Sequence, residues 1–440
     1  MNNMPISSEV IEKQINTINL KNVGRASIRE IKLLINNVEK ETGIKFVRME
    51  MGIPGLPAPQ IAIDAEKEAL DNGVASLYPD IDGLALLKNE ISRFVKQFLN
   101  INVSPHCCVP TVGSINGAYA SFMVAGRMNQ KKNTVLLVDP GFPVHKQLVK
   151  MVGLNQESFD VYNYRGEKLR EKLEAILKNG NIAAMLYSNP NNPSWICFTE
   201  EELKIIGDLA NKYDVVVVED LAYFAMDFRK DLSKPGVSPF QATVARYTDN
   251  YILLISSSKS FSYAGQRVGM LVVSCKLFDS KHDDLIKYFP SNNFGHALVH
   301  GAIYNTTAGV SHSAQYGLAA MLKAANDGKF NFVEIVKEYG RKAAILKKMF
   351  NDNGFNIVYD KDINELIGDG FYFTIAYPGF TGDELIKELL YYGISAISLS
   401  ITGSEKQGIR ACVSLIKESQ FEDLEKRLKS FNENHKKSSN

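Results

Sequence analysis

Short apolar runs alternate with segments of helical spacing through the middle of this chain, and this alternation constrains the fold more than any other feature. The runs lie at 134–138, 182–187, 215–218, 251–255 and 268–273. Each run is too short for a typical helix and is apolar at almost every position, as expected of strands that are covered on both faces. Buried strands separated by helices are typical of a mostly parallel sheet. The sequence therefore predicts an α/β sandwich.

Two of the connecting segments carry clear helical signals. Residues 168–178 and 199–213 show helical spacing, and the second begins with Thr199 followed by three glutamates. A threonine with a glutamate three positions later is a capping box, which marks the start of a helix. We expect both segments to be helices that connect parallel strands.

The pattern changes after about residue 320. A long charged helical pattern at 333–350 is followed by weaker strand signals around 371–375 and 408–413, which favours a smaller α+β lobe. The amphipathic segment 27–41 is expected to pack on that lobe. The polar tail, 432–440, is expected to fray.

These signals predict two domains. Residues 56–320 would form the large domain, and 1–55 would join 321–440 in the small one.

Composition favours small-molecule ligands. The 440 residues carry a net charge of +1, with 50 basic and 49 acidic side chains, so there is no electrostatic footprint for nucleic acid or an anionic membrane. No apolar run approaches the roughly 18 residues of a membrane span, and the first residues lack the basic and apolar regions of a secretory signal. We therefore expect a cytoplasmic protein.

The five cysteines, at positions 107, 108, 197, 275 and 412, are odd in number and include no CxxC pair. This pattern favours reduced, mostly buried thiols over disulfides or a zinc site. We expect no metal.

A lysine and an arginine follow the fourth apolar run. In open α/β sheets ligands bind beyond the carboxyl ends of the strands, so residues just after the runs are the first candidates for function. Lys259 lies there in a loop of small residues, where an amine can be partly desolvated and reactive. Arg267 suits planar recognition of an anion such as phosphate, although a structural ion pair is the ordinary alternative.

Two further loops add polar groups. Asp220 follows the valine-rich run and could pair with a protonated ring nitrogen, while Tyr223 could hydrogen-bond a phenolate-like oxygen. Gly113 and Ser114 introduce a helical stretch whose first N–H groups could bind phosphate. Taken singly, these residues are better explained as an ordinary helix cap, a capping aspartate and a packed tyrosine.

The remaining candidates are an asparagine and a distal arginine. The turn at 189–193 could aim the Asn192 amide at a cofactor oxygen, and Arg410 could bind a carboxylate through two parallel hydrogen bonds. Turn formation and an ordinary strand arginine are the alternatives. Together the five motifs offer groups for a phosphate, a ring nitrogen, a phenolic oxygen, an aldehyde carbon and a carboxylate, which is the set that pyridoxal 5′-phosphate and its substrate require.

In their order and chemistry these motifs resemble the class I/II aminotransferases, the aspartate aminotransferase-like branch of the fold-type I pyridoxal phosphate enzymes. The resemblance runs from about Arg48 to Ser414. It implies a large domain with a mostly parallel seven-stranded sheet in an αβα sandwich, plus a smaller α+β domain. It also implies pyridoxal 5′-phosphate as cofactor, and an amino acid and a 2-oxo acid as substrates.

The resemblance assigns the catalytic residues. Lys259 would form the Schiff base and shuttle the proton, and Asp220 would keep the ring nitrogen protonated. Tyr223 and Asn192 would hydrogen-bond the 3′ oxygen of the ring, on which Phe142 would stack.

The resemblance assigns the binding residues as well. The phosphate would be held by Gly113, Ser114, Ile115, Ser256 and Arg267. Arg410 would fix the substrate carboxylate, together with Asn192 and the backbone at Gly52. Tyr78 matches a tyrosine that reaches the phosphate of a neighbouring subunit, which implies a homodimer with its active sites at the interface. The family often has cis peptides at the equivalents of Asp139-Pro140 and Asn192-Pro193.

Two of the chain's departures from the family pattern bear on the substrate pocket. Where the family usually reads Asn-Pro-Thr-Gly, this chain reads Asn192-Pro193-Ser194-Trp195. Aspartate-specific relatives carry an arginine about thirty residues after the lysine, and 289–294 contains none, which disfavours a dicarboxylic substrate. Trp195, Phe224 and Phe294 suggest a neutral or bulky substrate side chain.

The predicted activity is transamination in two half-reactions. A lyase or decarboxylase on the same scaffold is the first alternative, because the same residues would bind cofactor and carboxylate in each case. A catalytically silent regulatory module is the second. It is disfavoured because the segment before the resemblance is too short and insufficiently basic for a DNA-binding domain.

Overall fold

The computed structural model describes residues 4–436, and the chain divides into two compact units. Unit 1 consists of Met1–Gly55, Asn192–Ile196 and Lys337–Asn440, and unit 2 consists of Leu56–Asn191 and Cys197–Val336. Each unit has its own sheet and its own buried core.

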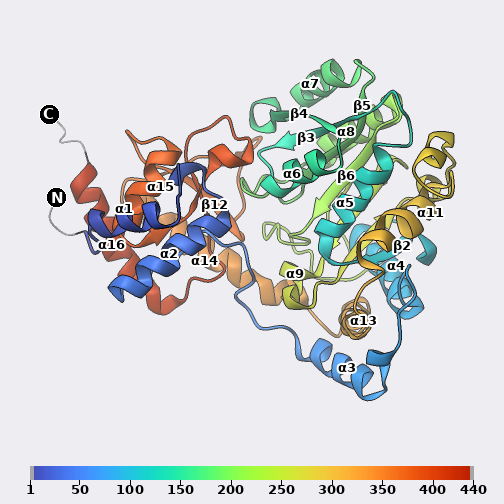
Figure 1. Cartoon of the computed structure of the whole chain (residues 1–440), viewed down its shortest axis with the longest axis horizontal. Coiled ribbons are helices and arrows are strands. Elements are labelled where there is room, and N and C mark those ends of the chain that lie inside the picture. Colours follow the sequence, from blue (N-terminus) through green and yellow to red (C-terminus); the bar gives the residue numbers. More distant parts are fainter. Residues whose placement is uncertain (1–3, 437–440) are drawn as a thin grey trace. The chain divides into compact units, whose positions relative to one another are not determined.

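Unit 2 is built on a seven-stranded sheet (Figure 1). Its strands are β2 (Cys108–Thr111), β3 (Thr134–Asp139), β4 (Asn155–Asp160), β5 (Ile182–Ser188), β6 (Val216–Leu221), β7 (Tyr251–Ser256) and β8 (Gly269–Val273). They lie in the order β2-β8-β7-β6-β5-β3-β4. In this sheet β8 runs antiparallel to both of its neighbours, and the remaining pairs are parallel. The predicted α/β fold with a mostly parallel sheet is confirmed.

The five apolar runs form β3, β5, β6, β7 and β8, whereas β2 and β4 were not predicted. Both missed strands lie at the edges of the sheet. Asn155 and Gln156 of β4 are exposed, so this edge strand needs no continuous apolar run. Strand β2 has only four residues, too few to show a period.

The register of the sheet brings several loops to one edge. Asp220 pairs with Ser188 and Leu254, so β5, β6 and β7 end at nearly the same level. Gly269, the first residue of β8, pairs with the last residues of both its neighbours, Ser256 and Thr111. The loops after β2, β6 and β7 and the loop before β8 therefore leave the sheet together.

Helices surround the sheet of unit 2. They are α3 (Gln60–Asp71), α4 (Ala85–Leu99), α5 (Gly113–Ala125), α6 (Pro143–Met151), α7 (Glu167–Leu177), α8 (Glu200–Tyr213), α9 (Ser257–Ser260), α10 (Cys275–Phe278), α11 (Phe294–His296), α12 (Tyr304–Thr307) and α13 (His312–Asn326). Helix α5 packs on β7 and β8 and contributes Phe122 to the main core cluster. Helix α13 packs between α3 and α4.

The two predicted connecting helices are confirmed as α7 and α8. Helix α8 begins with the predicted capping box, in which the Thr199 hydroxyl accepts from the Glu202 backbone N–H and the Glu202 carboxylate accepts from that of Thr199. Glu202 also forms a buried ion pair with Arg165, at 2.8 Å. Glu202, which takes part in the capping box, thus also links α8 to the segment that contains Arg165.

Unit 1 combines both ends of the chain. Its helices are α1 (Ser8–Thr17), α2 (Ile28–Thr42), α15 (Gly382–Tyr391) and α16 (Phe421–His435), together with most of α14 (Phe332–Asp352). Its strands are β1 (Val47–Arg48), β9 (Asn356–Ile357), β10 (Lys361–Asp362), β11 (Glu365–Leu366), β12 (Tyr372–Ala376), β13 (Ile394–Ser395), β14 (Ile397–Ser398) and β15 (Ile409–Cys412). Strand β1 pairs with β13, which ties the N-terminal segment to the C-terminal part.

The predicted amphipathic helix is α2, which buries Leu34 and Val38 in unit 1. The expected fraying from residue 432 is wrong as far as His435, where α16 ends. The Tyr377 hydroxyl donates to Asn432 at 2.7 Å, and a ring nitrogen of His435 lies 3.0 Å from the Glu388 carboxylate. Polar partners thus hold the last turn, while the final residues, 437–440, lie outside the described part of the chain.

Within residues 4–436, no helix combines the length and the apolar character that crossing a bilayer requires.

Candidate active site

Lys259 and Asp220 follow neighbouring strands of unit 2. Lys259 is half-buried in α9, directly after β7, and its Nζ lies 5.9 Å from the centre of the Tyr223 ring. Asp220 is buried near the end of β6, where its Oδ1 accepts from the Ala222 N–H at 3.1 Å. Burial raises the pKa of Asp220 to about 6, and the charge of Lys259 pulls it the other way. The buried Asp220 carboxylate is thus close enough to the Lys259 amine for the charge of the amine to lower its pKa.

His145 is a neighbour of Asp220 that no sequence motif pointed to. It is buried in α6, with its Nε2 3.7 Å from Asp220 Oδ2 and its ring edge-to-face with that of Phe142 at 5.6 Å. Burial lowers the pKa of His145 to about 4, so the ring is neutral at pH 7. Its Nδ1 has no hydrogen-bond partner in the described part of the chain. The sequence signal was weak: a histidine a few residues after an apolar run.

The loop after β2 and the loop before β8 lie together and offer groups that suit an anion; we call this arrangement the anion cradle. Gly113, the first residue of α5, has φ +71°, and a Cβ there would overlap the guanidinium of Arg267. No side chain caps α5, so its first N–H groups stay available to a ligand. The exposed Arg267 donates to the Ala264 carbonyl at 2.8 Å. A guanidinium next to the N-terminus of a helix favours a bound anion.

The other expected phosphate residues lie in the same loops. Ser114 and Ile115 follow Gly113 in α5, half-buried and exposed respectively. Ser256 is buried at the end of β7, and its hydroxyl accepts from the Ser258 N–H at 3.1 Å. The Ser258 hydroxyl in turn lies 3.5 Å from Arg267 Nη1. The structure thus gathers the whole predicted phosphate set at one sheet edge.

In unit 1, Arg410 is buried, and no carboxylate of residues 4–436 forms an ion pair with it. Its Nη2 donates to the Glu50 carbonyl at 2.6 Å, its Nη1 donates to Asn192 Oδ1 at 3.2 Å, and its guanidinium lies 4.3 Å from the centre of the Tyr372 ring. Among the described residues Nε has no hydrogen-bond partner, and the Glu50 carboxylate pairs with Arg48 instead. A buried cation of this kind is costly unless an anion joins it, so the arrangement suits a ligand carboxylate.

Tyr372, which the sequence reasoning also missed, is the centre of this group. A Cβ at Gly52 would overlap the Tyr372 hydroxyl, so the backbone there passes close to the ring. Trp195 is fully buried with φ +64°, and its ring lies 6.3 Å from that of Tyr372. A Cβ at Gly370 would overlap the Trp195 indole, so a glycine makes room for the tryptophan. The structure therefore brings Gly52, Asn192 and Arg410 together.

The remaining expectations have different outcomes. The expected cis peptides, Asp139-Pro140 and Asn192-Pro193, are both present. Tyr78 is 95% exposed, and no contact within the described residues brings it to the other site residues. Phe224 packs against Phe94 at 5.0 Å, and Phe294 is fully buried in the main core cluster. These two phenylalanines are core residues and carry no information about the substrate.

Asp220→Asn is expected to stabilise the cofactor-free protein at neutral pH. Because burial raises the folded-state pKa of Asp220 from 3.8 to about 6, the folded chain keeps a proton that the unfolded chain releases in this window, and stability falls as the pH rises through it. The shift corresponds to roughly 3 kcal/mol. Urea unfolding should show the variant more stable above pH ~7, with the difference vanishing below pH ~4. Equal stability at both pH values would contradict a buried, destabilising carboxylate.

Residues 45–428 match the family model for aminotransferase class I and II. The chain is 25% identical over 380 residues to a probable aspartate aminotransferase of Methanocaldococcus jannaschii, covering 77% of this chain and 92% of the relative. It is also 25% identical over 324 residues to an aspartate aminotransferase of Bacillus subtilis, covering 72% and 74% of the two chains.

Solved structures share the fold. A mutant of Thermus thermophilus aspartate aminotransferase superposes with a TM-score of 0.74 at 17% identity, covering 93% of this chain and 96% of that one. An alanine aminotransferase of Pyrococcus furiosus gives 0.73 at 20% identity, with 94% and 98% covered. The fold is therefore that of the fold-type I enzymes. With the family match spanning most of its length, the chain belongs to the class I and II aminotransferases and is a pyridoxal-phosphate-dependent enzyme of transamination.

Proposed function

We propose that this enzyme moves the amino group of an α-amino acid to a 2-oxo acid in two half-reactions, with Lys259 as the amine that moves the proton. The observation that carries the proposal is the placement of Lys259 and Asp220 after the neighbouring strands β7 and β6, with the Tyr223 ring beside the amine. The lyase and decarboxylase alternatives gain no support from the relatives described above.

The residues of unit 2 fit pyridoxal 5′-phosphate. The uncapped start of α5 and the guanidinium of Arg267 suit its phosphate, and the glycine at 113 leaves space that a Cβ would fill. When bound, the cofactor supplies an aldehyde carbon and an electron-withdrawing ring. Asp220 would balance the proton on the ring nitrogen. Because His145 is neutral at pH 7, it adds no competing positive charge beside that carboxylate.

The other proposed roles in unit 2 belong to Lys259, Tyr223 and Phe142. The half-buried Lys259 Nζ would take the proton from the substrate Cα and return it one step later. Tyr223 would donate to the ring's 3′ oxygen, and Phe142, which already packs on His145, would cover one face of the ring. These groups hold the reacting atoms and leave the bond changes to the cofactor.

Arg410 is proposed to bind the substrate α-carboxylate. It is a buried guanidinium whose Nε points to no partner in residues 4–436, and Asn192 and Tyr372 fix its plane. Relatives of this chain carry names that specify aspartate, asparagine, kynurenine and LL-diaminopimelate as amino donors. An α-carboxylate is common to all four. The proposed substrate class is therefore α-amino acids. The panel of donors includes aspartate, after which relatives are named, and neutral amino acids, which the lack of an arginine at 289–294 favours.

A half-reaction assay tests the function. The enzyme is incubated with single amino acids and no acceptor, and the cofactor is followed by absorbance. A donor should convert the bound cofactor once to its pyridoxamine form and release one equivalent of 2-oxo acid. Continued release of ammonia or carbon dioxide without an acceptor would instead establish a lyase or a decarboxylase. The Lys259→Ala variant, which lacks the proposed catalytic amine, is the negative control.

We further propose that the enzyme is a homodimer in which Tyr78 serves the partner's phosphate site. Leu77 and Tyr78 are 62% and 95% exposed between η2 (Val74–Ser76) and α4, and adjacent large side chains of this kind favour burial against a second copy. Mixing Lys259→Ala chains with Tyr78→Phe chains should give activity above either variant alone, because one site of each mixed dimer is intact. No gain on mixing, or a monomer in sedimentation, would refute the proposal.

Two coarser assignments complete the proposal. We take unit 2 as the large cofactor domain and unit 1 as the smaller domain. We place the enzyme in the cytoplasm, where its five cysteines, all free, would stay reduced.

A further inference from the structure

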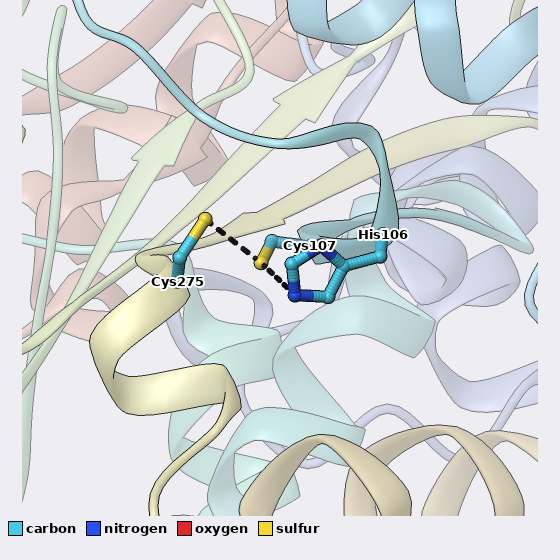
Figure 2. Close-up of side chains that lie close together, drawn as sticks. All are labelled: His106, Cys107 and Cys275. Atoms are coloured by element: carbon cyan, nitrogen blue, oxygen red, sulfur yellow. Dashed lines mark hydrogen bonds between the residues drawn. The ribbon is translucent and has the colours of Figure 1, made fainter.

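A histidine and two cysteines from distant segments of unit 2 lie together near the edge strand β2 (Figure 2). His106 and Cys107 belong to η3 (Pro105–Cys107), just before β2, and Cys275 is the first residue of α10, just after β8. The antiparallel pairing of Cys108 with Val272 brings these two segments side by side. The cluster therefore lies at the opposite end of β2 from Thr111 and the anion cradle.

The three donor atoms converge. Cys107 Sγ lies 3.0 Å from Cys275 Sγ and 3.2 Å from His106 Nε2, and all three atoms are within 4.8 Å of one another. Thiolate sulfur and imidazole nitrogen are the donors that zinc prefers, at about 2.3 and 2.0 Å from the ion. Small side-chain rotations would let one ion contact all three donors.

The surroundings orient the donors for an ion. His106 Nδ1 lies 2.8 Å from the Ser104 hydroxyl, which can hold the proton on Nδ1 and leave the lone pair of Nε2 facing the sulfurs. The backbone N–H of Ser104 donates to Cys275 Sγ at 3.4 Å, a contact that stabilises a thiolate. Phe278 packs edge-to-face on the His106 ring at 5.5 Å and fixes its plane. Outer contacts of this kind accompany histidine ligands in metal sites.

A carboxylate near His106 could supply a fourth ligand to an ion. Asp279 follows α10, four residues after Cys275, and its carboxylate lies 3.3 Å from His106 Nε2. The side chains of His106 and Asp279 are 50% and 63% exposed, so an ion can enter from solvent. Asp279 would compensate the charge of the ion or, after rotation, bind it in place of a water molecule.

We propose that His106, Cys107 and Cys275 bind a thiophilic divalent cation, with Zn²⁺ the best fit, and that Asp279 or water completes the site. Two sulfurs, one imidazole and one oxygen donor are borderline-soft ligands that favour Zn²⁺ over Mg²⁺ or Ca²⁺. The ion would link the start of β2 to α10 across 168 residues of sequence, as a structural clamp outside the catalytic groups. A disulfide between the two cysteines would account for their contact but would leave the orientation of His106 unexplained.

The test uses the tag-free, cofactor-loaded chain, kept reduced, stripped with a chelator and titrated with Co²⁺ alone. Co²⁺ should bind at about one equivalent per chain and show the intense d–d bands of a tetrahedral site with thiolate ligands, and Zn²⁺ should displace it. Elemental analysis of the untreated protein should find zinc. A rise in the thermal unfolding midpoint with Zn²⁺ would support binding to the folded chain.

Two variants and one control make the test specific. His106→Gln should weaken Co²⁺ binding by more than about 100-fold, since losing only an outer contact already costs about 10- to 100-fold. The exposure of His106 makes this change tolerable for the fold. Cys275→Ser should abolish the thiolate bands, whereas Cys197→Ser, at a buried cysteine outside the cluster, should leave them unchanged.

Three outcomes would overturn the proposal. They are no Co²⁺ or Zn²⁺ binding by the reduced wild-type chain, binding that His106→Gln leaves intact, and a Cys107–Cys275 disulfide found by mass spectrometry in protein purified without oxidant. Transamination does not enter any of these readouts, so their failure and the failure of the proposed function are distinguishable.

Discussion

Lys259→Ala should lower turnover by about 10²- to 10⁴-fold while leaving a protein that still binds pyridoxal 5′-phosphate. The ε-amine is the proposed group that moves the proton at the substrate carbon, and it lies 5.9 Å from the centre of the Tyr223 ring. Cofactor binding should survive, because the phosphate cradle at Gly113 and Arg267 uses no atom of Lys259.

The measurement separates chemistry from folding. Single-turnover absorbance with the best amino donor gives the rate, and cofactor content gives the fraction of folded sites. Small primary amines added to Lys259→Ala should restore part of the rate, which a purely structural role would not permit. Lys146→Ala is a matched control, because Lys146 pairs with Asp139 at 2.6 Å and has no proposed chemical role. Near-normal turnover in Lys259→Ala would refute the assignment.

Arg410→Gln should raise KM for the amino donor by roughly 10²- to 10³-fold with a smaller effect on kcat, because truncating one partner of a buried ion pair costs about 3–5 kcal/mol. Arg410→Lys should give a KM between that of Arg410→Gln and that of the wild type. A lysine keeps the charge but loses the planar fork and the stacking on Tyr372, whose ring centre lies 4.3 Å from the guanidinium.

Arg427→Gln is the matched control for this prediction. Arg427 is also a mostly buried arginine of unit 1, but its guanidinium donates to the backbone carbonyls of Gly393 and Lys45. Its loss should lower stability without changing KM. Steady-state kinetics with several amino donors would measure KM for both variants. An unchanged KM in Arg410→Gln would exclude Arg410 as the residue that binds the substrate carboxylate.

The parts of the fold that the sequence predicted share one physical property, a local and repeated signal. Strands such as β6 and β7 are apolar at nearly every position because both faces are covered, so their runs stand out. The capping box at Thr199 marks the start of helix α8 in the sequence. The two edge strands lack such a signal because β4 is partly exposed and β2 is short.

The residues of the candidate site also differ in whether the sequence alone could identify them. Lys259, Asp220 and Arg267 could be chosen from the sequence because they follow or precede buried strands, and loops at strand ends are where α/β sheets bind ligands. His145 and Tyr372 could not be chosen, because a histidine in a helix and a tyrosine in a strand have many ordinary uses. Their importance comes from the contacts with Asp220 and Arg410.

By itself, therefore, the amino-acid sequence determined the alternation of strands and helices, the family and the loops proposed to carry the chemistry, since burial on both faces and strand-end motifs leave local patterns. The tertiary structure alone decided which residues meet across long sequence separations. Arg410 reaches Asn192, 218 positions away, and Cys275 reaches Cys107, 168 positions away. Such contacts depend on the register of paired strands and the packing of whole elements, which no local pattern of side chains encodes.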